Sequence, residues 1–249
     1  MDKKGFSPLR FLVLAVITGN IYFNYAYNNV FGLRSNTEVS EMYPSLFTPS
    51  GYAFSIWGII YISFLVYGVI QLLPSNRNIH LYDRLSVPLI LVNFFASLWL
   101  YLFATDRIDI SMGVIALMLF ISWIMFRFAR EAALGNVLSG WIKFPFSLLF
   151  GWLTVATIAN FSIWLVSNTV LPAGQNPVII VLYILIALIV TLVVTYIYCD
   201  HIYPAVMTWA MLAIWAARMN DYPIIAYSAL TVAVLSQVWS FYVWRKKER

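Results

Sequence analysis

The sequence predicts an all-α protein, a polytopic transmembrane helix bundle with about eight spans. Its composition is the first reason: 62% of the 249 residues are hydrophobic and 10% are charged, whereas soluble domains are roughly 45–50% apolar and about 25% charged. The second reason is that the charges lie in short zones separated by long uncharged intervals. Such a chain must use lipid as its solvent, which excludes a soluble globular enzyme, a disordered chain and a disulfide scaffold.

The uncharged intervals define the expected spans, because roughly 20 apolar residues cross a bilayer as a helix. The interval 144–199 is long enough for two helices, and residues 168–177 (NTVLPAGQNP) divide it with turn-forming residues. The expected helices cover residues 9–28, 51–73, 86–104, 109–128, 144–167, 178–199, 203–218 and 222–244. The seventh of them is short, so a seven-span protein is the alternative.

Lysine and arginine predict the orientation, because they gather on the cytoplasmic side of membrane proteins. With the N-terminus inside, the inside segments hold 12 of the 15 basic residues, and only Arg34, Arg107 and Arg218 lie outside. A seven-helix protein would place the basic tail RKKER outside. We therefore expect both termini in the cytoplasm, with a bacterial plasma (inner) membrane as the simplest location. The net charge of +5 follows from this bias and suits anionic lipid rather than a nucleic-acid partner.

The expected spans carry few groups that could support catalysis or bind a metal. No H-x-x-x-H, C-x-x-C or G-x-S-x-G pattern occurs, and no lysine lies within a span. The neighbouring residues Asp200 and His201 are interpreted as a helix end rather than a catalytic dyad, because adjacent residues on a helix diverge. No buried carboxylate marks an ion path. The sequence therefore predicts no catalytic residue, no metal site and no resident cofactor.

Aromatic rings and asparagines gather on the faces of three expected helices. They recur at intervals of three or four on the second helix and of four on the fifth, so each series lies on one helical face. An asparagine amide is unfavourable against lipid. Two interpretations stay open, namely interhelical hydrogen bonding and orientation of the polar edge of a flat apolar ligand. The residues are Phe54, Trp57, Tyr61 and Phe64 on the second helix, Asn93 and Trp99 on the third, and Trp152, Ala156, Asn160 and Trp164 on the fifth.

Three stretches of the chain resemble the TspO/MBR family, the tryptophan-rich sensory proteins that are relatives of the translocator protein, or peripheral benzodiazepine receptor. Residues 44–61 (PSLFTPSGYAFSIWGIIY) resemble its loop and second helix, 93–103 (NFFASLWLYLF) its third helix and 145–164 (PFSLLFGWLTVATIANFSIW) its fifth. Their order and spacing also fit. The chain departs from the family pattern at Ser50, where a second proline is usual, and at Phe146, where the family has tyrosine.

The resemblance implies a TspO-like five-helix bundle over residues 1–168, followed by three additional transmembrane helices and a basic cytoplasmic tail over residues 169–249. It also implies a pocket near the first loop, since family members bind tetrapyrroles such as protoporphyrin, and some bind sterols or synthetic drugs. The loop 29–50 would form a lid, in which Arg34 could pair with a propionate. The implied ligand-binding residues are Phe54, Trp57, Tyr61, Asn93, Trp99, Trp152, Ala156 and Asn160.

Together, the residues and the resemblance favour an integral membrane TspO-like binding or sensory protein over an enzyme. Its ligand would be a planar hydrophobic molecule, such as a porphyrin or other tetrapyrrole, or an isoprenoid; a porphyrin would be a ligand rather than a cofactor. A facilitative transporter of a small hydrophobic or neutral solute is the alternative, followed by an intramembrane enzyme and a structural subunit. The expected partners are membrane lipid and the ligand, with a homodimer left open.

Overall fold

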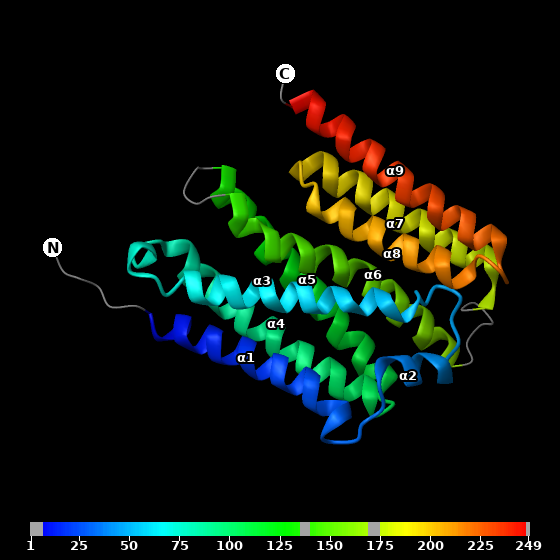
Figure 1. Ribbon diagram of the computed structural model, residues 1–249, viewed down its shortest axis with the longest axis horizontal. Helices are drawn as coiled ribbons and strands as arrows, with labels where there is room; N and C mark the ends of the chain where they lie inside the picture. The colour runs from blue at the N-terminus through cyan, green and yellow to red at the C-terminus, as the bar shows by residue number, and fades with distance from the viewer. Residues whose placement is uncertain (1–6, 135–139, 169–174, 248–249) are drawn as a thin grey trace.

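The structure is a computed structural model that describes residues 7–134, 140–168 and 175–247, and Figure 1 shows them as a bundle of long helices. The predicted turn at residues 168–177 lies largely outside this part. A 3₁₀ turn at Gly51–Ser55 leads into the third helix of the chain, and a short helix comes before that turn. The helices are α1 (Pro8–Asn29), α2 (Asn36–Met42), α3 (Ile56–Ile70), α4 (His80–Ala104), α5 (Ile108–Leu134), α6 (Phe144–Ser167), α7 (Pro177–Tyr198), α8 (Ile202–Arg218) and α9 (Pro223–Lys247).

The long helices of the described chain confirm the predicted polytopic bundle. Seven helical segments are long and apolar enough to cross a membrane. The eighth, α8, has 17 residues and a length of about 26 Å at 1.5 Å per residue, slightly less than a hydrocarbon core of about 30 Å. It nevertheless packs within the bundle against α6 and α9. The chain direction therefore alternates from helix to helix, and the beginning of α1 and the end of α9 lie on the same side (Figure 1).

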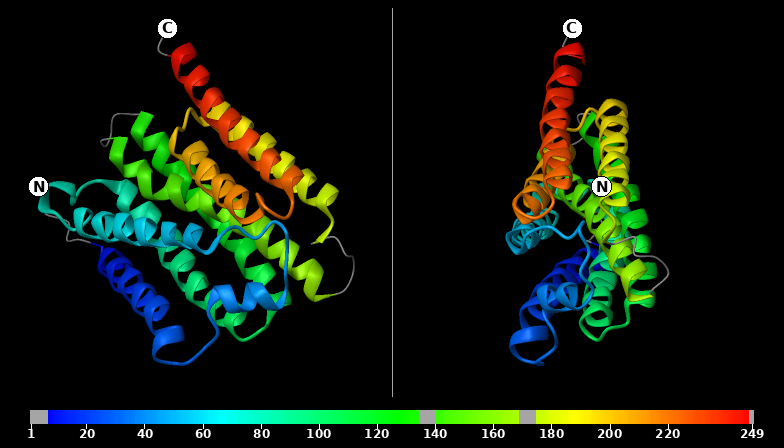
Figure 2. Two further views of the ribbon diagram at one scale, coloured as in Figure 1. Left: turned by 45° about the vertical axis from the view of Figure 1, so that its right-hand side comes forward. Right: turned by 90° about the vertical axis from the view of Figure 1, so that its right-hand side faces the viewer.

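The helices form two groups that are joined by α8. In the first group α4 packs between α1 and α5, and α6 packs against α5 and α3; in the second, α8 and α7 both pack against α9. Figure 2 shows the second group lying beside the first. The joint is close-packed: a Cβ atom on Gly151 of α6 would lie 3.0 Å from the Cβ atom of Val206 on α8. Glycine at this position therefore permits the close approach of the two helices.

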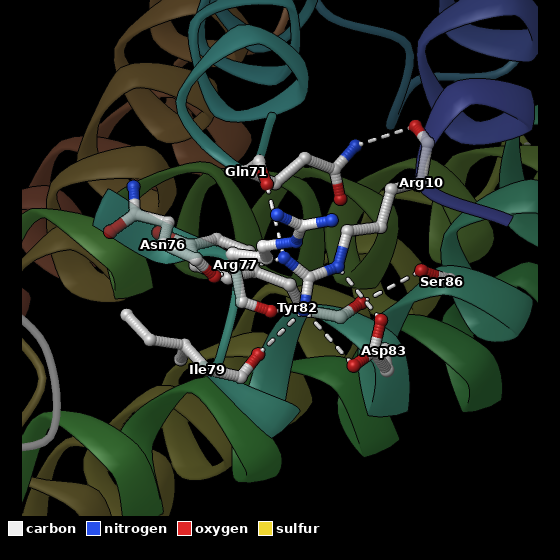
Figure 3. A network of polar contacts seen from close by, with 8 residues as sticks. All are labelled: Arg10, Gln71, Asn76, Arg77, Ile79, Tyr82, Asp83 and Ser86. Atoms are coloured by element: carbon white, nitrogen blue, oxygen red, sulfur yellow. Dashed lines mark hydrogen bonds and ion pairs between the residues drawn. The ribbon is translucent and has the colours of Figure 1, made fainter. Parts of the chain in front are cut away.

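Arg10, in the first turn of α1, is 1% exposed and organises the turn between α3 and α4 (Figure 3). Its guanidinium binds both carboxylate oxygens of Asp83 at 2.7 and 3.0 Å. It also donates to the backbone carbonyls of Gln71, Asn76 and Ile79 at 2.9–3.1 Å. Only arginine offers five donors in a rigid fork. The positive-inside pattern of the sequence includes Arg10 only as an inside charge, and its structural role follows from the packing of α1 against the turn after α3.

Asp200 and His201 act at the junction between α7 and α8. The Asp200 carboxylate is buried and accepts hydrogen bonds from two backbone N–H groups in the first turn of α8, at 2.8 and 3.0 Å. Its second oxygen accepts from the Ser147 hydroxyl on α6 at 2.9 Å. The His201 ring points elsewhere, with Nδ1 2.8 Å from the Ser240 hydroxyl. The interpretation of this pair as a helix end is therefore confirmed.

Replacement of Arg10 by methionine should destabilise the protein, because it removes the donors to Asp83 and to the carbonyls after α3. Each buried acceptor left without a donor costs about 1–3 kcal/mol. The control is Arg84→Met, at a side chain that is 55% exposed on the same end of the bundle. Thermal unfolding in detergent, followed by size-exclusion chromatography, should show a lower melting temperature for Arg10→Met than for Arg84→Met. Equal losses would contradict the assigned role.

Candidate ligand-binding site

Most of the predicted site residues line one small pocket between α3, α4 and α6. Its volume is about 40 Å³, and residues of α2 and of the segment before α3 also line it. We call it the aromatic pocket, and we call residues 43–55 the cover segment. The predicted residues on its wall are Phe54, Trp57, Trp99, Trp152, Ala156 and Asn160. Tyr61 and Asn93 do not line it.

The rings of α3 and of the turn before it pack against Trp152 on α6. Trp152 is 1% exposed. Phe54 and Trp57 meet it edge to face, with ring centroids 6.0 and 6.5 Å away and interplanar angles of 84°. Tyr61 lies one turn beyond Trp57 and stacks on the Trp57 ring, with the ring centroids 5.5 Å apart. Edge-to-face and offset-stacked geometries are favourable for aromatic pairs, so contacts among these four rings hold α3 against α6.

Asn160 connects three helices at the wall of the aromatic pocket. Its side-chain oxygen accepts a hydrogen bond from the Trp99 indole N–H at 2.9 Å. Its amide nitrogen lies 3.4 Å from the Ser111 hydroxyl on α5. Asn160 is 3% exposed, so these bonds satisfy a buried amide. Asn160 therefore forms hydrogen bonds between helices, which is the first of the two interpretations. Its side chain also lines the pocket.

Tyr61 and Asn93 both face α1 instead of the pocket. The amide of Asn24 donates to the Tyr61 hydroxyl at 2.8 Å, and the amide of Asn20 donates to the Asn93 oxygen at 3.0 Å. Asn20 and Asn24 were not among the predicted site residues. Their spacing of four residues was the available signal, because it places both on one face of α1.

Three polar atoms on the side chains that line the aromatic pocket have no hydrogen-bond partner in the described part of the chain. They are Nε1 of Trp152, Oγ1 of Thr48 and Oδ1 of Asn36, and all three are buried. Most buried polar atoms have a partner, and an unmade hydrogen bond costs about 1–3 kcal/mol. Trp152 was predicted as a site residue. Thr48 and Asn36 were not, since no periodic pattern distinguishes them within the loop.

The cover segment is held in place by Arg218 at the end of α8. The guanidinium donates to the backbone carbonyls of Ser45, Leu46 and Thr48 at 2.9–3.2 Å. The sequence placed Arg218 among the outside charges, and left open whether it lines the same cavity or belongs to the membrane boundary. Its partners lie 170–173 residues away along the chain, a separation that no local pattern reveals.

Two further hydrogen bonds join α8 to the cover segment. The Trp209 indole donates to the Ala53 carbonyl at 3.1 Å. The Ser50 backbone N–H donates to the Ala213 carbonyl at 3.1 Å. The Trp209 ring also meets Tyr52 edge to face at 5.3 Å. The cover over the aromatic pocket is therefore positioned by a helix that follows residue 168.

Arg34 lies at the surface and outside the aromatic pocket. It borders a separate hollow with Glu38, Glu41 and Met42. The adjoining helix α2 starts with a capping box, in which Ser35 and Glu38 exchange hydrogen bonds between side chain and backbone. The hydrogen bonds from Ser35 hold the pKa of the Glu38 carboxyl below its ordinary value. This cap fixes the beginning of α2, the helix that contributes Asn36 to the pocket.

A bundle of apolar helices around a buried aromatic pocket defines an integral membrane protein. A model of the family described as TSPO-like protein matches residues 10–242, so the chain belongs to this family. The match continues past residue 168 and includes helices α7 and α8 together with most of α9. A search of curated proteins and a search of solved structures found no match.

Replacement of Arg218 by glutamine should loosen the cover segment, because glutamine cannot donate to three carbonyls at once. The segment contains aromatic residues that chymotrypsin cleaves, among them Tyr43, Phe47 and Tyr52. Limited proteolysis should therefore cut Arg218→Gln faster there than the wild type. Arg107→Gln, at an exposed arginine on the same end of the bundle, is the control. Equal cleavage rates in all three proteins would show that Arg218 does not restrain the segment.

Proposed function

We propose that this TSPO-like protein is a membrane-embedded binding or sensory protein for a planar hydrophobic ligand with a polar edge, and that a tetrapyrrole is the ligand class. The observation that supports this most directly is that three residues of the aromatic pocket each carry a buried polar atom without a hydrogen-bond partner in the described part of the chain. Ligand sites in proteins are mostly apolar and aromatic, with a few polar groups that orient the ligand. The aromatic pocket has this composition.

The volume of the aromatic pocket limits how a ligand enters. A pocket of about 40 Å³ is comparable with one water molecule at about 30 Å³, whereas ligand pockets usually measure roughly 300–1,000 Å³. A tetrapyrrole therefore does not fit this arrangement. Binding requires the cover segment to move and the rings of Phe54 and Trp57 to separate from Trp152. In the open site, Trp57 and Trp152 would supply stacking surfaces and Ala156 a place of close approach.

Opening couples the pocket to α8. The cover segment must release Arg218, Trp209 and the Ala213 carbonyl before it can move as a unit. A ligand that binds only the open state shifts the population toward it. The change in the contacts of α8 is then the signal of a sensory protein.

We further propose that both termini face the cytoplasm of a bacterial plasma membrane. The support is the positive-inside rule, applied to the end of the bundle where α1 begins, which we call the basic end. Its described charges are Arg10, Arg77, Arg84, Arg127, Arg130, Lys143, Arg245 and Lys246 against Asp83, Glu131 and Asp200.

Trp152→Phe should weaken protoporphyrin binding, because it keeps an aromatic ring but removes the unpartnered N–H. The loss of one hydrogen bond, about 0.5–1.5 kcal/mol, corresponds to a roughly 2- to 10-fold higher Kd. Trp123→Phe is the matched control, since it also removes one fluorophore but lies on α5 beside Phe120 and Arg127. The measurement is quenching of tryptophan fluorescence in detergent, with empty micelles as the blank.

Arg218→Gln should accelerate protoporphyrin binding in the same assay, because it weakens the closed state. The proposed function fails if quenching of the wild type does not exceed that of an unrelated membrane protein. It also fails if both tryptophan variants bind as the wild type does. The alternative function, a facilitative transporter of a small hydrophobic or neutral solute, would then be tested by measuring solute flux across the membrane of liposomes that contain the protein.

A further inference from the structure

A second layer of side chains lies behind the wall of the aromatic pocket, toward α1. Trp57 lines the pocket, whereas Tyr61, one turn further along α3, does not. The Tyr61 ring stacks on the Trp57 ring, with the centroids 5.5 Å apart and an interplanar angle of 23°. Tyr61 is 9% exposed. A change in the position of the Tyr61 ring therefore changes the surface against which the Trp57 ring rests.

A hydrogen bond to α1 holds the far end of the Tyr61 side chain. The Asn24 amide nitrogen donates to the Tyr61 hydroxyl at 2.8 Å. Asn24 belongs to α1, and no residue of this helix lines the aromatic pocket. In a membrane, water is not available to replace either partner of such a bond. The Tyr61 side chain is thus fixed at both ends, through its backbone on α3 and through its hydroxyl on α1.

A second polar contact lies one turn away on α1 and leads to a different helix. The Asn20 amide donates to the Asn93 oxygen at 3.0 Å, and its own oxygen accepts from the Ser97 hydroxyl at 2.9 Å. Both partners belong to α4, and none of the three residues lines the aromatic pocket. α1 therefore makes two polar contacts of similar kind, and the contact through Tyr61 is the one that leads to a ring of the pocket wall.

The orientation of the Trp57 ring matters for a planar ligand, because aromatic pairs favour offset-stacked or edge-to-face geometries. In the closed pocket the ring has two aromatic neighbours among the described residues, Trp152 and Tyr61. Trp152 must separate from it when a tetrapyrrole enters. Tyr61 is then the ring that still contacts Trp57 and can keep its orientation.

We propose that Tyr61 is a positioning residue of the ligand site, and that Asn24 of α1 sets the orientation of Trp57 through it. This inference rests on the proposed function, since the task it assigns to Tyr61 is to present the Trp57 ring to the planar ligand. α1 thereby belongs to the site although it contributes no residue to the wall. A shift of α1 against α3 is transmitted to the stacking surface.

The first test needs no ligand. Protein that contains fluorotryptophan gives one fluorine NMR resonance for each tryptophan, and the resonance that is absent from Trp57→Phe is that of Trp57. Asn24→Leu removes the donor but changes no atom of Tyr61 or Trp57, and it should shift or broaden this resonance. Asn20→Leu is the matched control, because it removes an asparagine one turn away on the same helix. It should leave the Trp57 resonance at its wild-type position.

The second test separates positioning from stability. Asn24→Leu and Tyr61→Phe each leave one polar group without its partner and should lower the melting temperature, whereas the double variant removes both groups and should recover most of the loss. Binding should not recover with it. Each single variant and the double variant should raise the Kd for protoporphyrin by the same factor, roughly 2- to 10-fold, as for one lost hydrogen bond. The measurement is quenching of tryptophan fluorescence in detergent.

The proposal is overturned if the Trp57 resonance of Asn24→Leu coincides with that of the wild type. It is also overturned if the Kd of the double variant returns to the wild-type value together with the melting temperature, because the hydrogen bond would then act through stability alone. Absence of saturable quenching in the wild type would instead contradict the proposed function, and the fluorine resonance would still decide whether Asn24 orients Trp57.

Discussion

Backbone carbonyls in the segments before and after α3 accept hydrogen bonds from two arginines of other helices. At one end Arg10 of α1 donates to carbonyls of the turn that follows α3. At the other end Arg218 of α8 donates to carbonyls of the cover segment. Within a membrane an unsatisfied backbone group is especially costly, because water is not available to replace the partner. These two guanidinium groups therefore fix the position of α3.

The proposed ligand site depends on α3 being fixed in this way. The inner face of α3 contributes Trp57 to the aromatic pocket, whereas Ile62 and Val66 on its outer face are exposed. A ligand that opens the pocket would therefore have to move the cover segment and the Trp57 ring against contacts that both arginines stabilise.

The particular residues show where sequence patterns are informative and where they are not. Helical spacing placed Phe54 and Trp57 on one face, and Trp152, Ala156 and Asn160 on another. These two faces do meet in the structure. The same spacing did not show that Tyr61 and Asn93 point toward α1. A helical face is wide enough to border two neighbours, and periodicity alone does not assign each residue to one of them.

The sequence by itself determined the helical class, the approximate bounds of the long helices and the family resemblance. These depend on local properties, since an apolar segment in lipid must satisfy its own backbone and so becomes a helix. Only the tertiary structure decided which polar groups meet. Arg10 with Asp83 and Arg218 with Ser45 join residues 73 and 173 positions apart. The physical reason is that a buried polar group takes its partner from whichever helix packs beside it, and helix packing is a property of the whole chain.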